Sequence, residues 1–303
     1  MAISRSQLVK ELEPGLNALF GLEYKRYENQ HAEIYTSENS DRAFEEEVML
    51  SGFGNAQVKG EGAGVSFDEA QETFTARYTH ETVALAFAIT EEAIEDNLYD
   101  RLAARYTKAL ARSMSNAKQV KAVEPLINGL PSTNTFKSGD GVSLFNTSHT
   151  TVSGSFKNTL STQADLNETS LEQSMIDIAQ MTDERGLRIA ARGVKMIIPS
   201  ELQFTAERLM KSQGRTGTAD NDINAIVSMG MVPQGYRVNN YLTDSDAFYI
   251  LTDVPNGMKM FTRAPLTTAM EGDFDTGNVR YKARERYSFG VSDPRGIFGV
   301  EGA

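Results

Sequence analysis

The sequence predicts an α+β fold with extended parts, and three observations support this prediction. The segment 90–122 has the spacing of one long helix, and the segment 166–261 alternates helical and strand-like patterns. The segment 279–291 has the two-residue period of a long strand. Separate helical and strand blocks beside a compact α/β stretch are typical of an α+β chain. The 303 residues suffice for one large domain or two ordinary ones.

The composition is that of a folded protein without cysteine chemistry. Hydrophobic residues make up 40% and charged residues 23% of the chain. The chain has no apolar run of about 18 residues and no apolar signal-peptide core, so we expect no contact with a membrane. There is no cysteine, which excludes disulfides, thiolate metal sites and cysteine nucleophiles.

The net charge of -11 is concentrated in the first third of the chain. Residues 1–100 carry 20 acidic and 7 basic side chains, whereas residues 101–303 carry 21 acidic and 23 basic ones. This distribution fits a solvated acidic surface, or an acidic segment that binds basic faces of other copies. It argues against nucleic-acid binding as the main activity, because that activity needs basic patches along the phosphates.

The first 90 residues predict an arm followed by a hairpin. Pro14 and Gly15 are expected to interrupt any long helix, and the polar segment 23–43 is expected to form little independent core. Five glycines fall between residues 52 and 64, and the segment 74–79 then alternates as a strand does. We therefore expect a two-stranded hairpin with a glycine-rich tip. It needs a partner surface, because such a hairpin is marginal alone.

The glycine-rich stretch KGEGAGVSF does not match a phosphate-binding loop. A Walker loop places its lysine after the glycines and leads into a helix, and a dinucleotide loop has the pattern G-x-G-x-x-G. Here Lys59 precedes the glycines, Glu61 would repel a phosphate, and strand-like sequence follows. The spacing of Gly60, Gly62 and Gly64 is G-x-G-x-G. These glycines indicate a flexible hairpin tip.

The strongest local signal is the helix predicted over 90–122. Thr90 is a suitable N-cap, and no proline follows until Pro125. Apolar residues recur every four positions, at Ile94, Leu98, Leu102, Tyr106, Leu110 and Met114. Each step advances about 400°, so the stripe drifts about 40° per step and its two ends need different neighbours. The alternative is two helices with a break near Ser113–Asn116.

The rest of the chain predicts loops, a compact α/β region and a long strand. The segment 128–165 is rich in Gly, Ser, Thr and Asn, which indicates loop with short strands. Two helices follow, each with a capping box and a terminal glycine. The residues are Thr169, Glu172 and Gly186 for the first helix, and Ser200, Gln203 and Gly214 for the second. Strands are expected at VKMIIP, GYRVNNYL, AFYILTD and GMKMFTR.

No constellation of residues indicates catalysis, and we expect no enzyme activity, cofactor or metal. The three histidines lie far apart and lack the spacing of a zinc site. Hydroxyl side chains flank His149, so a hydrolase that uses it with a nearby carboxylate is one alternative. No G-x-S-x-G elbow accompanies it. The run Glu45, Glu46 and Glu47 could bind a cation, but a solvated strand edge or an intersubunit contact fits it better.

The order of these elements resembles the major capsid protein of tailed bacteriophages, the HK-97-type fold, over nearly the whole chain. Four stretches also resemble the Mu-like major head subunit family. They are LFNTSHT at 144–150, LSTQADLNETSLEQSMIDIAQMTDERG at 160–186, MIIPSELQFTAERLMKS at 196–212 and DPRGIFG at 293–299.

The resemblance implies a role for each segment. These roles are an N-terminal arm at 1–40, an extended β-hairpin loop at 41–86, a peripheral domain with the spine helix at 87–165, an α/β axial domain at 166–261 and return strands of the peripheral domain at 262–303. It also implies assembly in the bacterial host cytoplasm into hexamers and pentamers of an icosahedral virion capsid. Such a shell encloses double-stranded phage DNA without sequence-specific contact.

The resemblance further implies partner proteins. The chain shows no long charged helical N-terminal extension, so we expect a separate scaffolding protein or a chain already processed, together with a portal and a decoration protein. An encapsulin-type nanocompartment, which packages protein cargo, is the alternative to a phage capsid.

Two groups of residues are expected at contacts between copies. The loop tip and acidic strand contribute Glu45, Glu46, Glu47, Lys59, Gly60, Glu61, Gly62 and Gly64. The basic face of the last long strand contributes Arg280, Lys282, Arg284 and Arg286, while Glu285 interrupts its apolar face. Some relatives cross-link a loop lysine to an asparagine of a neighbour. Lys59 is the only lysine in the loop segment, but nothing in the sequence identifies its partner, and we expect no cross-link.

Overall fold

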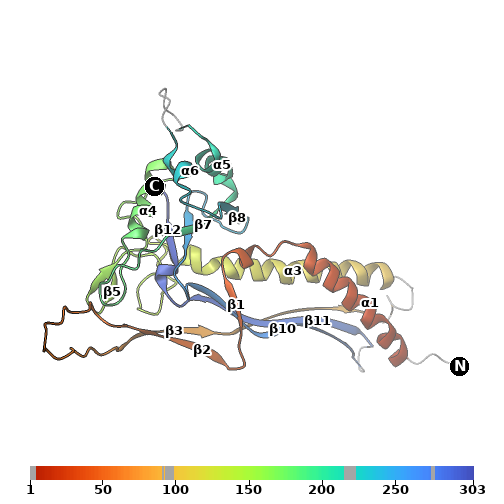
Figure 1. Cartoon of the computed structure of the whole chain (residues 1–303). Coiled ribbons are helices and arrows are strands. Elements are labelled where there is room, and N and C mark those ends of the chain that lie inside the picture. The colour runs from red at the N-terminus through yellow and green to blue at the C-terminus, as the bar shows by residue number, and fades with distance from the viewer. Residues whose placement is uncertain (1–4, 91, 93–98, 215–222, 274–276) are drawn as a thin grey trace.

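The computed structural model describes residues 5–90, 92, 99–214, 223–273 and 277–303. Figure 1 shows an elongated body, a lobe that stands on it, and a thin hairpin that extends beyond one end of the body. The first described residues, from Arg5 on, lie at the other end of the body, and the C-terminus lies in the lobe. Among the described residues, no helix is both long enough and apolar enough to cross a membrane.

A four-stranded sheet forms the floor of the body. Its order is β1 (Thr36–Asn39), β10 (Met258–Gly272), β11 (Val279–Val291) and β4 (Glu81–Ile89). β1 runs parallel to β10, and the other pairs are antiparallel. β11 confirms the predicted long strand. β10 is much longer than GMKMFTR predicts, because its polar second half is hydrogen-bonded along the whole of β11.

Two helices, α1 (Arg5–Arg26) and α3 (Tyr99–Asn128), cover one face of this sheet (Figure 1). α3 runs unbroken through Ser113–Asn116, so the alternative of a break there is wrong. It also continues past residue 122 and includes Pro125. The predicted start after Thr90 falls mostly on residues outside the described ranges.

The side chains of the predicted apolar stripe are described only from Tyr106 on, so its drift towards different neighbours stays a prediction. Leu110 and Met114 pack in one cluster with Tyr281 of β11. Leu126, farther along the helix, packs in a second cluster with Tyr249 of the lobe. The two ends of α3 therefore have different neighbours, and the helix connects the body to the lobe.

The arm is more structured than its sequence predicts. α1 passes through Pro14, so the expected interruption is wrong. Leu16 and Phe20 are buried beyond the proline. Full burial of such side chains contributes roughly 1.5–3 kcal/mol each, which offsets the cost of about 3 kcal/mol for proline within a helix. Ile34 and Tyr35 are also core residues, but they pack in a cluster with residues of α3 and β11 such as Leu126 and Tyr287, so the segment 23–43 forms no core of its own, as expected.

The predicted hairpin is confirmed and has two distinct parts. β2 (Phe44–Leu50) and β3 (Glu72–Thr79) pair antiparallel and form what we call the loop stem. Residues 51–71 between them, here called the loop tip, form no helix or strand. β4 follows directly after His80 and joins the sheet of the body.

The lobe contains a second four-stranded sheet, with the order β12 (Ile297–Val300), β9 (Phe248–Thr252), β7 (Gly193–Ile198) and β8 (Tyr236–Val238). The helices α4 (Glu168–Ala179), α5 (Gln203–Lys211) and α6 (Ala225–Met229) complete the lobe, and a small hairpin of β5 (His149–Thr151) and β6 (Gly154–Phe156) lies below (Figure 1). The domain boundaries stay predictions, but β12 pairs with β9. The segment 262–303 is therefore divided between the two sheets.

Both predicted capping boxes are wrong. The box of α4 is formed by Asn167 and Ser170, whose side chains bond each other's backbone N–H groups. Asparagine is as good an N-cap as the predicted threonine, so the sequence offered two competing starts. α4 ends at Ala179, well before Gly186. α5 follows a 3-10 turn at Ser200–Leu202 and has no side-chain cap.

Candidate assembly interface

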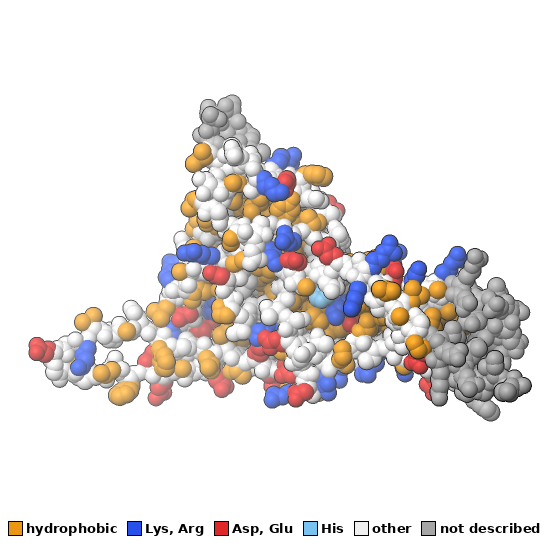
Figure 2. Space-filling model, turned by 45° about the vertical axis from the view of Figure 1, so that its right-hand side comes forward, with side chains coloured by type: hydrophobic (Ala, Val, Ile, Leu, Met, Phe, Trp, Pro, Cys, Tyr) orange, Lys and Arg blue, Asp and Glu red, His pale blue; other side chains and the backbone are white. Residues whose placement is uncertain are grey.

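The loop tip carries large apolar side chains that the chain itself leaves exposed. Phe67 is 97% exposed, and Phe53, Val58 and Val65 are exposed as well. Figure 2 shows hydrophobic side chains at the surface of this projecting end. Burial of each such side chain would contribute roughly 1.5–3 kcal/mol, and a group of exposed apolar side chains marks an interaction site. The tip therefore has the surface of a segment that binds another molecule.

The predicted residues of the loop tip lie together in one exposed turn. Lys59, Gly60, Glu61, Gly62 and Gly64 are all exposed. Ala63 donates its N–H to the carbonyl of Gly60, and Gly62 has φ +77°. This left-handed conformation favours glycine, so at least one of the predicted glycines is required by the turn.

The acidic strand β2 has partners within its own chain. Glu47 accepts from Lys259 Nζ at 2.5 Å, and Lys259 is buried. Glu45 accepts from Ser40 Oγ at 2.7 Å. Glu46 lies 3.7 Å from Arg77 in an exposed pair. Exposed pairs contribute only about 0–1 kcal/mol, so Glu46 can exchange its partner easily, whereas Glu47 holds the loop stem on the sheet.

The basic residues of β11 form a row on the outer face of the body. Tyr281 and Ala283 are buried towards α1 and α3, and alternate strand residues face opposite ways. Lys282 and Arg284 are therefore on the face without helices, beside small side chains such as Ala86 of β4. Within the described residues, neither has a carboxylate partner in its own chain. Arg280 pairs with Asp273 at 2.5 Å, and Arg286 is half-buried.

The loop tip and the start of the basic row lie at opposite ends of the subunit. In Figure 1 the tip extends from one end of the body, while β11 begins at the other end, near α1. The acidic tip of one copy and the start of the basic row of the same copy are therefore kept apart. Opposite charges at two distant sites of one chain fit contacts with a second copy.

His149 has a structural environment. Its ring is fully buried. Nδ1 lies 2.6 Å from Asp140 Oδ2, and Nε2 lies 3.0 Å from Asn158 Oδ1. The amide nitrogen of Asn158 donates to two backbone carbonyls, so its oxygen faces the histidine and accepts from Nε2–H. The ring is enclosed by these partners and stacks on Phe156 with centroids 4.8 Å apart. This geometry does not favour the hydrolase alternative.

Burial and hydrogen bonding act in opposite directions on Asp140. Burial raises the pKa of its carboxyl group, but hydrogen bonds from His149 and Ser138 outweigh burial and hold the pKa below its usual value. Asp140 is therefore a carboxylate that fixes the loop 138–149 to the small hairpin.

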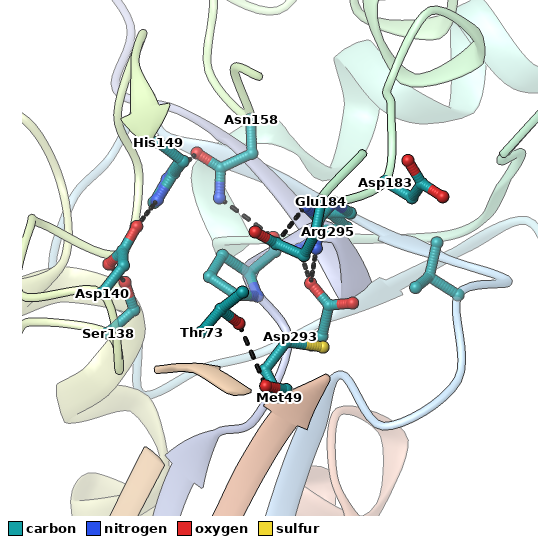
Figure 3. Close-up of polar contacts among 12 residues, drawn as sticks. Met49, Thr73, Ser138, Asp140, His149, Asn158, Asp183, Glu184, Asp293 and Arg295 are labelled. Carbon is teal, nitrogen blue, oxygen red and sulfur yellow. Dashed lines mark hydrogen bonds and ion pairs between the residues drawn. The ribbon is translucent and has the colours of Figure 1, made fainter. Parts of the chain in front are cut away.

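Arg295 forms a second buried centre next to His149 (Figure 3). It donates to Glu184 at 2.5 Å, to Asp293 at 3.2 Å and to the carbonyl of Thr182 at 2.8 Å. Its guanidinium also lies over the ring of Phe156, 4.1 Å from the centroid. Burial raises the pKa of Asp293 even though Arg295 lowers it. The stretches 144–150, 160–186 and 293–299, which carry the resemblance, thus meet at a structural junction.

Sequence reasoning missed the residues that set the direction of the loop. Lys259 and Ser292 bind the stem, at Glu47 and Tyr78, and Arg185 reaches the tip from the lobe. Each contact joins residues more than 100 positions apart, so no local pattern indicates it.

Comparisons with known proteins support a shell-forming fold. A family model described as phage capsid protein matches residues 72–300. No curated protein matches the chain. The virus-like particle from Pyrococcus furiosus is similar with a TM-score of 0.52 and 11% identity, over 94% of this chain and 98% of that chain. The capsid of an empty GTA particle has a TM-score of 0.58 and 13% identity, over 90% and 89%.

The capsid of Myoviridae phage XM1 is also similar, with a TM-score of 0.54 and 11% identity, over 89% of this chain and 89% of that chain. At these identities the similarity concerns the fold. The family match, in contrast, covers most of the sequence, including the loop strand β3, the helix α3 and every strand of the two four-stranded sheets except β1. The chain therefore belongs to the phage capsid protein family: it is a major capsid protein with the HK-97-type fold, a structural protein of the virion that forms an oligomeric shell.

Proposed function

We propose that copies of this chain form hexamers and pentamers of an icosahedral shell around double-stranded phage DNA. The observation that carries this proposal is the separation of two complementary surfaces. An exposed loop tip with apolar and acidic residues lies at one end of the subunit, and the basic row of β11 begins at the other. A second copy can bring such surfaces together, and repetition of this head-to-tail contact generates a ring when the rotation between copies closes.

The strength of the shell would come from the sum of many contacts. Linked contacts act at high effective concentration, so the avidity of an assembly exceeds the affinity of any single contact. The apolar residues of the tip supply burial, and the basic row supplies ionic contacts that salt weakens. We propose the predicted contact residues for these two surfaces, with Glu46 more available than Glu47, because Lys259 already binds Glu47.

Other partners follow from the same proposal. A separate scaffolding protein, a portal and a decoration protein would act with the shell during assembly in the bacterial host cytoplasm. The packaged DNA would be enclosed without sequence-specific contact. Membership of the Mu-like subfamily stays a prediction.

Deletion of residues 52–66 tests the proposal. The stem strands lie outside the deletion, and Ser51 keeps its backbone bond to Gln71, so we expect a folded subunit by circular dichroism. We also expect no stable particles by light scattering and electron microscopy, whereas the unmodified chain forms particles tens of nanometres wide. Normal particles from the deletion variant would contradict the proposal. DNA or protein cargo inside the unmodified particles distinguishes a phage capsid from an encapsulin-type shell.

A further inference from the structure

The base of the loop tip is fastened to the lobe by one side chain. Arg185 donates from its terminal nitrogen to the carbonyl of Glu69 and lies 3.5 Å from Asp68 Oδ1. The other oxygen of Asp68 accepts from the backbone N–H of Gly54 at 2.7 Å. The two sides of the tip are thus joined to each other through Asp68, and both are joined to the lobe through Arg185.

A rigid turn presents Arg185 to the loop. Asp183 Oδ1 accepts from the backbone N–H groups of Arg185 and Leu187, at 2.9 and 2.7 Å. Gly186 has φ +81°, a left-handed conformation that glycine adopts without strain. Hydrogen bonds within the turn therefore fix the backbone from which Arg185 projects.

This turn is anchored in the buried junction. Glu184, the residue before Arg185, bonds in the opposite direction to buried Arg295, and its carbonyl accepts from the N–H of Ser153 at 3.2 Å. Figure 3 shows Glu184 directed to Arg295 and Asp183 directed away from it. The turn that carries Arg185 therefore cannot move without breaking the buried bond between Glu184 and Arg295. Such charge-assisted hydrogen bonds are stronger than those between neutral groups.

Apolar packing does not fill the space between the loop and the lobe. A cavity of about 380 Å³ lies there, lined by the end of the loop stem and by the lobe. Its apolar lining includes Met49, Leu50, Ile189 and Val254. Because apolar side chains do not close this pocket, the direction of the tip depends on polar contacts between loop and lobe such as the Arg185 bridge.

We propose that Arg185 is a positioning residue for shell assembly, which holds the loop tip in the direction in which it meets the next copy. This inference rests on the proposed function. A loop that is already ordered loses less conformational freedom when it binds, so preorganisation strengthens binding without any new contact. The guanidinium suits this role, because its terminal nitrogen Nη2 carries two N–H donors and contacts both the carbonyl of Glu69 and the carboxylate of Asp68.

The test compares Arg185→Ala with Arg188→Ala. Arg188 belongs to the same turn, is exposed, and donates to Gln180 within the lobe, so it is a matched control without contact to the loop. For Arg185→Ala we expect faster proteolysis and faster hydrogen exchange in residues 51–71 of the free subunit, with an unchanged melting temperature. We expect its critical concentration for assembly to rise about tenfold, which corresponds to about 1.4 kcal/mol. Arg188→Ala should match the unmodified chain in every measurement.

Two further variants separate this role from a general effect on folding. Asp68→Asn should raise the critical concentration in the same direction, and its effect should not add to that of Arg185→Ala, because both remove one bridge. Arg185→Lys decides the matter if the alanine variant does not fold, since it keeps the charge on a shorter side chain that ends before the position of Nη2. An unchanged critical concentration in Arg185→Ala, or in a folded Arg185→Lys if the alanine variant fails, would overturn the inference.

The outcome for the unmodified chain keeps the two proposals distinct. If the unmodified chain forms no particles, the proposed function fails, and proteolysis of the free subunit still reports whether Arg185 holds the loop. If it forms particles and the variants assemble equally well, only the role of Arg185 fails.

Discussion

Lys118 of α3 and Glu285 of β11 form an ion pair with 3.3 Å between Nζ and Oε2, in the core where α1 and α3 cover the sheet. Glu285 is only 2% exposed, and Tyr24 of α1 also donates to it, at 3.5 Å. The one acidic residue on the apolar face of β11 thus joins the strand to both helices. Burial raises the pKa of Glu285, although Lys118 and Tyr24 act to lower it.

Replacement of Lys118 by methionine should destabilise the subunit strongly at neutral pH. An unpaired buried charge costs about 3–5 kcal/mol, and the loss should shrink at acid pH, where Glu285 becomes neutral. Urea unfolding at neutral and at acid pH measures this loss in the free energy of unfolding. Lys121→Met is the control, because Lys121 lies one turn away and pairs only with exposed carboxylates. Equal losses for the two variants would show that the buried pair has no special role.

The pH dependence of stability should differ between the unmodified chain and Glu285→Gln. The folded protein holds the Glu285 proton more tightly than the unfolded chain does, because the folded pKa is raised. The free energy of unfolding therefore falls as the pH rises from the usual value of 4.5 through the folded pKa. The glutamine variant should lack this decrease in a series of urea titrations, and a parallel decrease in both proteins would refute the assignment.

Asp140 should show the opposite dependence. Its folded pKa is lowered, so its contribution to stability is present above the usual value of 3.8 and is lost as the pH falls through the folded pKa. Asp140→Asn should remove this acid-dependent loss. The exposed Asp41 supplies the control, since Asp41→Asn should leave the acid limb of the unfolding curve in place.

Gly290 should tolerate no side chain. A Cβ at this position would lie 2.6 Å from the ring of Tyr78, which packs the loop stem onto β11. Gly290→Ala should destabilise the subunit by about 1–3 kcal/mol, as overpacking does, and thermal unfolding measures the change. Gly272 in β10 has no neighbouring atom within 4 Å of an added Cβ, so Gly272→Ala should have a much smaller effect.

Charge reversal on the basic row should weaken assembly without unfolding the subunit. The double variant Lys282→Glu and Arg284→Glu replaces attraction by repulsion towards an acidic partner, and we expect the critical concentration to rise at least about tenfold, or about 1.4 kcal/mol. High salt should reduce the difference in critical concentration between the double variant and the unmodified chain. Lys108→Glu, on an exposed position of α3, is the control. Assembly that is indifferent to the double reversal would remove the basic row from the interface.

The sequence allowed prediction of features that depend on local pattern. The glycine-rich turn around Gly62 and the alternation along β11 are local, and so is the continuous helical spacing of α3. Features that depend on tertiary contacts were inaccessible. Tyr35 is in the core because its hydroxyl reaches the carbonyl of Ala122 at 2.6 Å, and nothing within 23–43 indicates this partner.

The candidate interface divides in the same way. The exposed tip and the basic row could be located from residue type and period, since both are surface features of single segments. The contacts that hold the loop in place could not be predicted from the sequence. Glu47 meets Lys259, and Arg185 meets Glu69, only after the chain has folded back over more than 100 residues. The internal partners of a surface determine which of its charges stay available to another copy.

The opposite orientations of Glu184 and Arg185 have a mechanical consequence. The side chain of Arg185 bonds to the loop, and the side chain of the preceding residue, Glu184, bonds to Arg295. Arg295 lies where the chain passes from the sheet of the body into the sheet of the lobe. A force that an adjoining subunit exerts on the loop is therefore transmitted through Arg185 and Glu184 to Arg295, between the two sheets. Binding of the loop tip by a neighbour thus acts on the angle between body and lobe of the same subunit.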